Sequence, residues 1–124
     1  KENIKERNKI AKKYYKALKN VPINFQSIRK KNLSSFHLFI VQFDLNESKF
    51  NFKKIFELFR KKRVFVNQHY MPLHLSPYFK KKGFKKNQFP NSENYSSTCL
   101  SIPIYPGLKR RDFLKVVKLI KDLF

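Results

Sequence analysis

Apolar residues at helical spacing alternate along this chain with short runs of β-branched and aromatic residues, and this alternation is what most constrains the fold. Residues 4–18 place apolar side chains three, four or seven positions apart, which predicts an amphipathic helix. Residues 36–43, FHLFIVQF, contain few polar side chains and predict a largely buried strand. We therefore expect an α+β domain in which helices cover one face of a small sheet.

The rest of the chain continues this alternation. The expected elements are helices at 49–62, 78–82, 91–100 and 111–124, and strands at 64–66 and 100–105. Pro103 either restricts the strand at 100–105 to a sheet edge or marks its end. Gly83 is expected to end the helix at 78–82. Residues 22–35 are polar and are expected to form an irregular connection. The sheet should therefore have about three strands.

Lysine dominates the charge of the chain. Its 124 residues include 29 Lys+Arg against 8 Asp+Glu, a net charge of +21. A hydrophobic content of 41% is too high for a disordered polycation, so one packed domain is expected. Lysine outnumbers arginine by 23 to 6, and the chain is rich in amino acids with AT-rich codons, so base composition explains much of this charge. We therefore expect only non-specific nucleic-acid binding, although a basic, ribosomal-type protein is an alternative.

Sparse glycine and cysteine exclude several classes of site. Two glycines cannot form either GxGxxG or the Walker loop. The single cysteine, Cys99, excludes multi-cysteine metal sites and is expected to be inert in the core; it also favours a cytoplasmic protein. No apolar run approaches the ~18–20 residues of a membrane helix, and the N-terminus lacks the apolar region of a secretory signal. Because the chain begins at Lys1, we expect a fragment or a processed product.

The segment 67–77 is the most informative for function. It contains His69, His74 and two prolines directly after an expected strand, where binding groups are often displayed. A metal site is disfavoured because no acidic residue or cysteine lies between positions 58 and 92. Two other interpretations remain: a rigid surface loop whose histidines satisfy local carbonyls, or a loop that contacts phosphate or sugar. No catalytic residue is identified, since the serines at 96, 97 and 101 lack a GxSxG context.

Four motifs, in this order and spacing, together resemble a known family. They are HLFIV at 37–41, VNQHYMPLHLSPY at 66–78, FPNSE at 89–93 and LSIPIYPGL at 100–108. This arrangement is similar to the C-terminal part of the DegT/DnrJ/StrS sugar aminotransferases. The nucleotide-sugar 4-aminotransferases of pseudaminic acid synthesis are the most similar branch.

The resemblance implies a fold and a cofactor. Such enzymes are fold-type-I homodimers that use pyridoxal phosphate to move an amino group, commonly from glutamate, to a UDP-linked 4-keto-6-deoxy-N-acetylhexosamine. Their Schiff-base lysine and cofactor ligands lie in a large domain upstream, and none of the 23 lysines here matches that motif. The chain resembles the small C-terminal domain at 21–124, preceded at 1–20 by the helix that joins the two domains. As a lone polypeptide it is expected to be inactive.

The resemblance also implies a binding loop. Asn67, His69 and Tyr70 would face the nucleotide-sugar or cofactor pocket, with His74 as a further member. The lysines at 80–82 and 85–86 would help to hold a diphosphate-linked sugar. A third interpretation is a non-catalytic remnant or dimerisation module, which would expose a large apolar patch.

Aromatic placement distinguishes these interpretations. A nucleic-acid-binding protein would expose aromatic side chains together on one face. That interpretation predicts that four phenylalanines are exposed together: Phe39, Phe52, Phe56 and Phe65.

Overall fold

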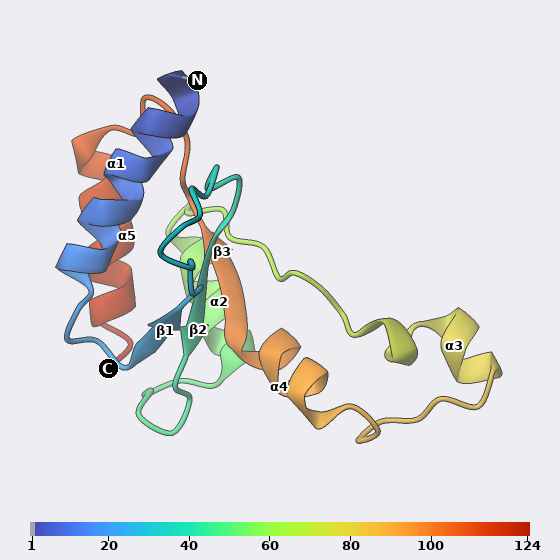
Figure 1. Cartoon of the computed structure of the whole chain (residues 1–124). Coiled ribbons are helices and arrows are strands. Elements are labelled where there is room, and N and C mark those ends of the chain that lie inside the picture. Colours follow the sequence, from blue (N-terminus) through green and yellow to red (C-terminus); the bar gives the residue numbers. More distant parts are fainter. Residues whose placement is uncertain (1) are drawn as a thin grey trace.

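A three-stranded antiparallel sheet with five α-helices and one 3-10 helix forms the chain in the computed structural model, which describes residues 2–124 (Figure 1). The elements in chain order are α1 (Glu2–Ala17), β1 (Ile23–Phe25), β2 (Phe39–Phe43), α2 (Phe52–Lys61), η1 (Leu73–Leu75), α3 (Pro77–Lys81), α4 (Pro90–Thr98), β3 (Cys99–Ile102) and α5 (Arg110–Lys121). This confirms the expected α+β class and its small sheet.

Strand β2 lies at the centre of the sheet, between β1 and β3. Phe39 is opposite Ile102 of β3, and Val41 is opposite Leu100. Alternate side chains of a strand point to opposite faces, so the buried Phe39, Val41 and Phe43 share one face. The other face meets α4, where the Gln42 side-chain amide donates to Thr98 Oγ1 at 3.0 Å. Both faces and both edges of β2 are therefore occupied.

Helices α1 and α5 lie side by side against the sheet (Figure 1). Tyr14 of α1 joins them: its ring centroid is 5.2 Å from that of Phe39 and 4.7 Å from that of Phe113 in α5. Ile55 and Phe59 of α2 belong to the same buried cluster. The Asn51 side chain caps α2 by accepting a hydrogen bond from the Lys54 backbone N–H.

A projection leaves this core between Val66 and β3. We call residues 70–89 the arm; it contains η1 and α3 and extends away from the sheet, and α4 leads the chain back to β3 (Figure 1). At the far end Gly83 has φ +93°, a left-handed conformation that glycine adopts without strain. The predicted stop of the preceding helix at Gly83 is confirmed, since α3 ends at Lys81.

Two predictions for the strands are wrong. The expected irregular segment contains β1, which pairs Ile23 with Phe43 and thereby satisfies the backbone groups along the second edge of β2. The expected strand at 64–66 is absent, because the Val64 N–H donates instead to the Phe59 carbonyl at the end of α2. Pairing with β3 begins only at Asn67.

The strand expected at 100–105 is observed as β3, at Cys99–Ile102. The prediction that Pro103 places this strand at a sheet edge or ends it is confirmed. The strand lies at the edge of the sheet and ends at Ile102, directly before Pro103. Its first residue, Cys99, was expected in the core and is buried; burial raises the pKa of its thiol. The helix expected at 91–100 ends two residues earlier, at Thr98, because the chain passes directly into β3.

Tyr14, whose ring packs between β2 and α5, also forms a hydrogen bond in this largely apolar core. Its side chain is fully buried, and its hydroxyl donates to the Pro103 carbonyl at 2.9 Å. Burial raises the pKa of Tyr14 far above its usual value, so the phenol stays protonated as a donor.

Replacing Tyr14 by Phe should therefore destabilise the fold. The change removes only the hydroxyl and leaves a carbonyl without its donor, which costs about 1–2 kcal/mol in the free energy of unfolding. Urea denaturation followed by circular dichroism measures this loss. Tyr78→Phe, the same chemical change at an exposed position, is the control and should alter the midpoint little. Equal midpoints for the two variants would contradict the assignment.

Candidate functional site

The base of the arm is fixed to the outer edge of β3. Asn67 and Ser101 form an antiparallel bridge, in which the Ser101 N–H donates to the Asn67 carbonyl at 2.8 Å and the reverse bond measures 3.3 Å. The Asn67 side chain is exposed. Its backbone thus sets the direction in which the chain leaves the sheet.

His69 lies against the same serine. Its Nε2 atom is 2.7 Å from Ser101 Oγ, and its ring meets the ring of Tyr70 edge-on at 4.7 Å between centroids. The Nδ1 atom is buried and has no hydrogen-bond partner among the described residues. Buried polar atoms are usually paired, so this nitrogen is an exception among the described residues.

Tyr70 points into solvent, with 72% of its surface exposed, although it is a large aromatic residue beside a half-buried histidine. Asn67, His69 and Tyr70 therefore lie together at the base of the arm, and their position facing a nucleotide-sugar or cofactor pocket stays a prediction. They present an amide, a ring nitrogen and a phenol, which are groups that orient sugar hydroxyls and phosphates by hydrogen bonding.

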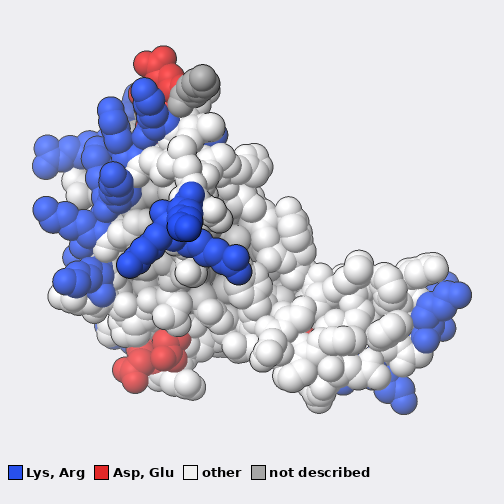
Figure 2. Space-filling view, viewed as in Figure 1, with Lys and Arg blue, Asp and Glu red and all other residues white. Residues whose placement is uncertain are grey.

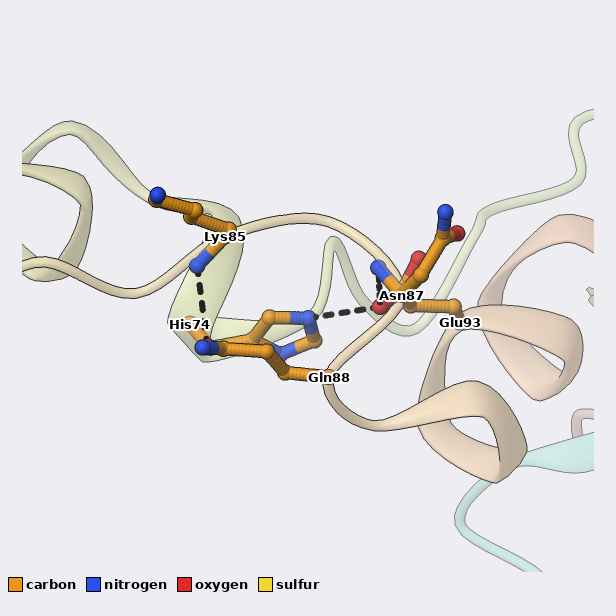
Figure 3. Close-up of polar contacts among 5 residues, drawn as sticks. All are labelled: His74, Lys85, Asn87, Gln88 and Glu93. Carbon is orange, nitrogen blue, oxygen red and sulfur yellow. Dashed lines mark hydrogen bonds and ion pairs between the residues drawn. The ribbon is translucent and has the colours of Figure 1, made fainter.

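His74 is placed differently, inside the arm. Figure 3 shows its Nε2 atom directed at Glu93 Oε1, at a distance of 2.9 Å. The same oxygen accepts a hydrogen bond of 2.7 Å from the backbone N–H of Asn87. The Phe89 ring lies 4.7 Å from that of His74, which is buried. The structure thus gives His74 a partner within the arm, and a role of this residue in the pocket stays a prediction.

These observations place the predicted binding loop on a defined scaffold, and the comparison with known proteins identifies that scaffold. The model of the DegT/DnrJ/EryC1/StrS aminotransferase family matches residues 1–121. The chain belongs to this family.

Relatives in the family extend well beyond the matched region. MJ1066 of Methanocaldococcus jannaschii, an uncharacterized protein, is 32% identical over 121 residues, which are 96% of this chain and 31% of that protein. SpsC of Bacillus subtilis, a spore coat polysaccharide biosynthesis protein, is 26% identical over 122 residues, again 96% of this chain and 31% of SpsC. The chain thus spans about a third of the length of these relatives.

Solved structures of the family share the fold. The PLP-form of the putative sugar aminotransferase Spr1654 from Streptococcus pneumoniae superposes with a TM-score of 0.87 at 20% identity, covering 98% of this chain and 31% of Spr1654. Helicobacter pylori PseC, an aminotransferase of pseudaminic acid biosynthesis, gives 0.81 at 20% identity, with coverage of 98% and 33%. At these identities the likeness shows the fold.

Helix α4 supplies contacts to this family domain that the sequence did not reveal. The Gln68 side-chain amide donates to the Ser96 carbonyl at 2.6 Å and lies 3.1 Å from Ser96 Oγ. Glu93 and Ser101 were also not identified as site residues. The sequence signal for them is weak: each is a polar residue within a family motif, Glu93 in FPNSE and Ser101 in LSIPIYPGL.

Positive charge is concentrated away from the base of the arm. Figure 2 shows lysine and arginine over the side that carries α1 and α5, over the front of the core and at the tip of the arm, with a stretch between core and tip that shows almost no lysine or arginine. The tip residues are Lys80, Lys81, Lys82, Lys85 and Lys86, all exposed. Their charge therefore acts at the tip and not beside His69.

Other features of the described residues do not add to this site. A cavity of about 470 Å³ is lined by residues including Arg63, Phe65 and Tyr105, and none of the four predicted site residues lines it. Within residues 2–124 no three His, Cys, Asp or Glu side chains gather as metal ligands. Over the same span, no helix combines the length and apolar character needed to cross a bilayer.

Glu93 should titrate at unusually low pH. Burial raises the pKa of its carboxyl, but hydrogen bonds from His74 and from the Asn87 and Phe89 backbone outweigh that effect and lower the pKa below its usual value. The ionised form therefore stabilises the arm fully above the ordinary Glu pKa of about 4.3, and this contribution is lost as the pH falls through the lowered pKa.

Carbon-13 NMR of the Glu93 carboxyl measures this titration. We expect a midpoint below that of a glutamate in an unstructured peptide, and a His74→Ala variant should move the Glu93 midpoint upward. A Glu93 midpoint equal to that of the unstructured peptide, or one that the His74→Ala variant leaves in place, would show that the contact with His74 does not hold in solution.

Proposed function

We propose that this chain is the small C-terminal domain of a PLP-dependent sugar aminotransferase, joined through residues 1–20 to a large domain. The enzyme would transfer an amino group from glutamate to a UDP-linked 4-keto-6-deoxy-N-acetylhexosamine for surface-glycan or nonulosonic acid synthesis. The family match over residues 1–121 supports the enzyme class. The names of SpsC and PseC support a role in polysaccharide or pseudaminic acid synthesis.

The observation that carries the proposal for this domain is the unpartnered Nδ1 of His69 beside the exposed Tyr70. A nucleotide sugar offers hydroxyl and phosphate groups that can pair with both side chains. In this proposal Asn67, His69 and Tyr70 orient the substrate, and His74 supports them from within the arm. The arm covers the cleft and keeps water from it.

The cofactor would be held mainly by the large domain. Structures of Spr1654 are described in PLP- and PMP-forms, which supports this cofactor for the family. A lysine that reacts with a carbonyl group is usually desolvated, whereas every lysine among residues 2–124 is exposed. We therefore assign the reactive lysine to the large domain. The bound cofactor supplies the electron sink for amino transfer, and this domain supplies orientation.

A dimerisation module is the second candidate, favoured by apolar side chains on the arm. Tyr70, Met71, Leu73 and Tyr78 are each more than half exposed. Such a patch is typical of a surface that is covered by a partner. Both candidates agree with a homodimer, and sedimentation of the isolated chain distinguishes them, because only the dimerisation module should associate without the large domain.

The nucleic-acid alternative is not favoured. Phe39 is fully buried, Phe52 and Phe56 are partly buried, and Phe65 is 71% exposed, so these rings do not form an exposed stacking face. We place the enzyme in the cytoplasm, in agreement with the free, buried Cys99.

The isolated chain should not bind pyridoxal phosphate stoichiometrically. After incubation with the cofactor and gel filtration, we expect no visible absorption beyond that of the unfolded chain, which controls for adducts on surface lysines. A stoichiometric visible band that responds to added glutamate would overturn the proposed division of labour.

In the longer enzyme, His69→Ala and Tyr70→Phe should each raise KM for the UDP-linked keto sugar about tenfold, the effect of one lost hydrogen bond to substrate. The half-reaction with glutamate should not change, and Tyr78→Phe serves as the control. Steady-state kinetics measure KM, and a TDP-linked keto sugar tests the nucleotide in parallel. An unchanged KM in both variants would contradict the proposed substrate contact.

A further inference from the structure

The arm is separate from the apolar core of the sheet and has only a small aromatic cluster of its own, in which the Phe84 ring lies 5.6 Å from that of Phe79 and 6.2 Å from that of Phe89. Among residues 2–124, the buried hydrophobic cluster takes no side chain from residues 70–89. Segments with few buried apolar contacts open more easily than the core unless other contacts hold them. The conformation of the arm therefore depends on its polar contacts together with this small aromatic cluster.

One carboxylate oxygen joins three parts of this region. Glu93 Oε1, on α4, accepts from the His74 ring in η1 and from the Asn87 backbone in the returning half of the arm (Figure 3). The side chain of His74 is 7% exposed and that of Glu93 is 14% exposed, so both atoms are largely removed from water. Hydrogen bonds to a charged group are stronger than those between neutral groups.

A second contact comes from the same helix. Ser96 lies three residues after Glu93, so both residues occupy one face of α4. Ser96 holds Gln68 through its carbonyl, and Glu93 holds His74. These two anchors bracket the segment that carries His69 and Tyr70.

We propose that this face of α4 is the template that fixes the loop at 68–74, and that Glu93 is a positioning residue for His69 and Tyr70. Glu93 acts through His74 and Asn87 and touches no substrate. The inference rests on the proposed function for its link to substrate, whereas its structural part can be tested on the chain alone.

Hydrogen exchange of the 124-residue chain tests the structural part. Glu93→Ala should speed exchange in residues 70–89 about tenfold, whereas Glu93→Gln, which keeps the acceptor oxygen, should restore most of the protection. Glu57→Ala is the matched control, because Glu57 is exposed and contacts only Lys54 at 3.8 Å. The urea midpoint of the core should be the same in all variants.

A double variant shows whether Glu93 and His74 act as a unit. Exchange in Glu93→Ala/His74→Ala should be no faster than in the faster single variant, because both changes break one contact. The nuclear Overhauser effect between the His69 and Tyr70 rings should weaken in Glu93→Ala. Two results would overturn the positioning role of Glu93. In one, the increases in exchange rate of the two single variants multiply in the double variant. In the other, residues 70–89 exchange equally fast in Glu93→Ala and in Glu57→Ala.

Kinetics of the longer enzyme test the link to substrate. Glu93→Ala should raise KM for the keto sugar about tenfold and leave the glutamate half-reaction unchanged, and Glu93→Gln should recover most of the loss. If His69→Ala raises KM and Glu93→Ala does not, the positioning inference is overturned. If neither changes KM, the proposed function fails, and the exchange and ring-contact results alone decide the role of Glu93.

Discussion

The central strand β2 is the constraint on which the rest of the structure depends. Its side chains Phe39, Val41 and Phe43 bury one face under α1 and α5, and its two edges pair with β1 and β3. Tyr14 closes this arrangement, because its ring packs on Phe39 while its hydroxyl binds the carbonyl that follows β3. A buried strand must satisfy every backbone group, so β2 fixes the position of β3 and, through β3, the base of the arm.

The molecule therefore combines two kinds of structure. The core is held by apolar burial over many residues, whereas the arm is held by hydrogen bonds to Glu93 of α4 and by contacts among its own aromatic rings. Asn67, His69 and Tyr70 lie where these two regions meet, whereas His74 lies inside the arm. His69 takes its position from Ser101 of the sheet, and its neighbour Gln68 is held by Ser96 of α4. A loop fixed from both sides is preorganised for binding, while the arm beyond it is easier to open.

Local periodicity in the sequence predicted the helices and β2, because amphipathic stripes and apolar runs are properties of neighbouring residues. It did not predict β1, since Ile23–Phe25 becomes a strand only by pairing with β2 some 18 residues later, as the register of Phe25 with Val41 and of Ile23 with Phe43 shows. Residues 64–66 carry a strand-like pattern, but the end of α2 binds the Val64 N–H. The family motifs led us to propose Asn67, His69 and Tyr70 as site residues, which stays a prediction. The contact between His74 and Glu93 spans 19 positions and needed three-dimensional information.

The fold shows where the net charge of +21 lies on the molecule. Part of it lies over α1 and α5, and part lies at the tip of the arm, far from β3 (Figures 1 and 2). At physiological ionic strength charges are screened over about 8 Å, so tip lysines do not attract a small anion held only at His69. They can contribute only to a ligand that extends along the arm. The orientation of the arm matters for the same reason: a change at Glu93 would move the lysines of the tip together with the loop that we propose to hold the sugar.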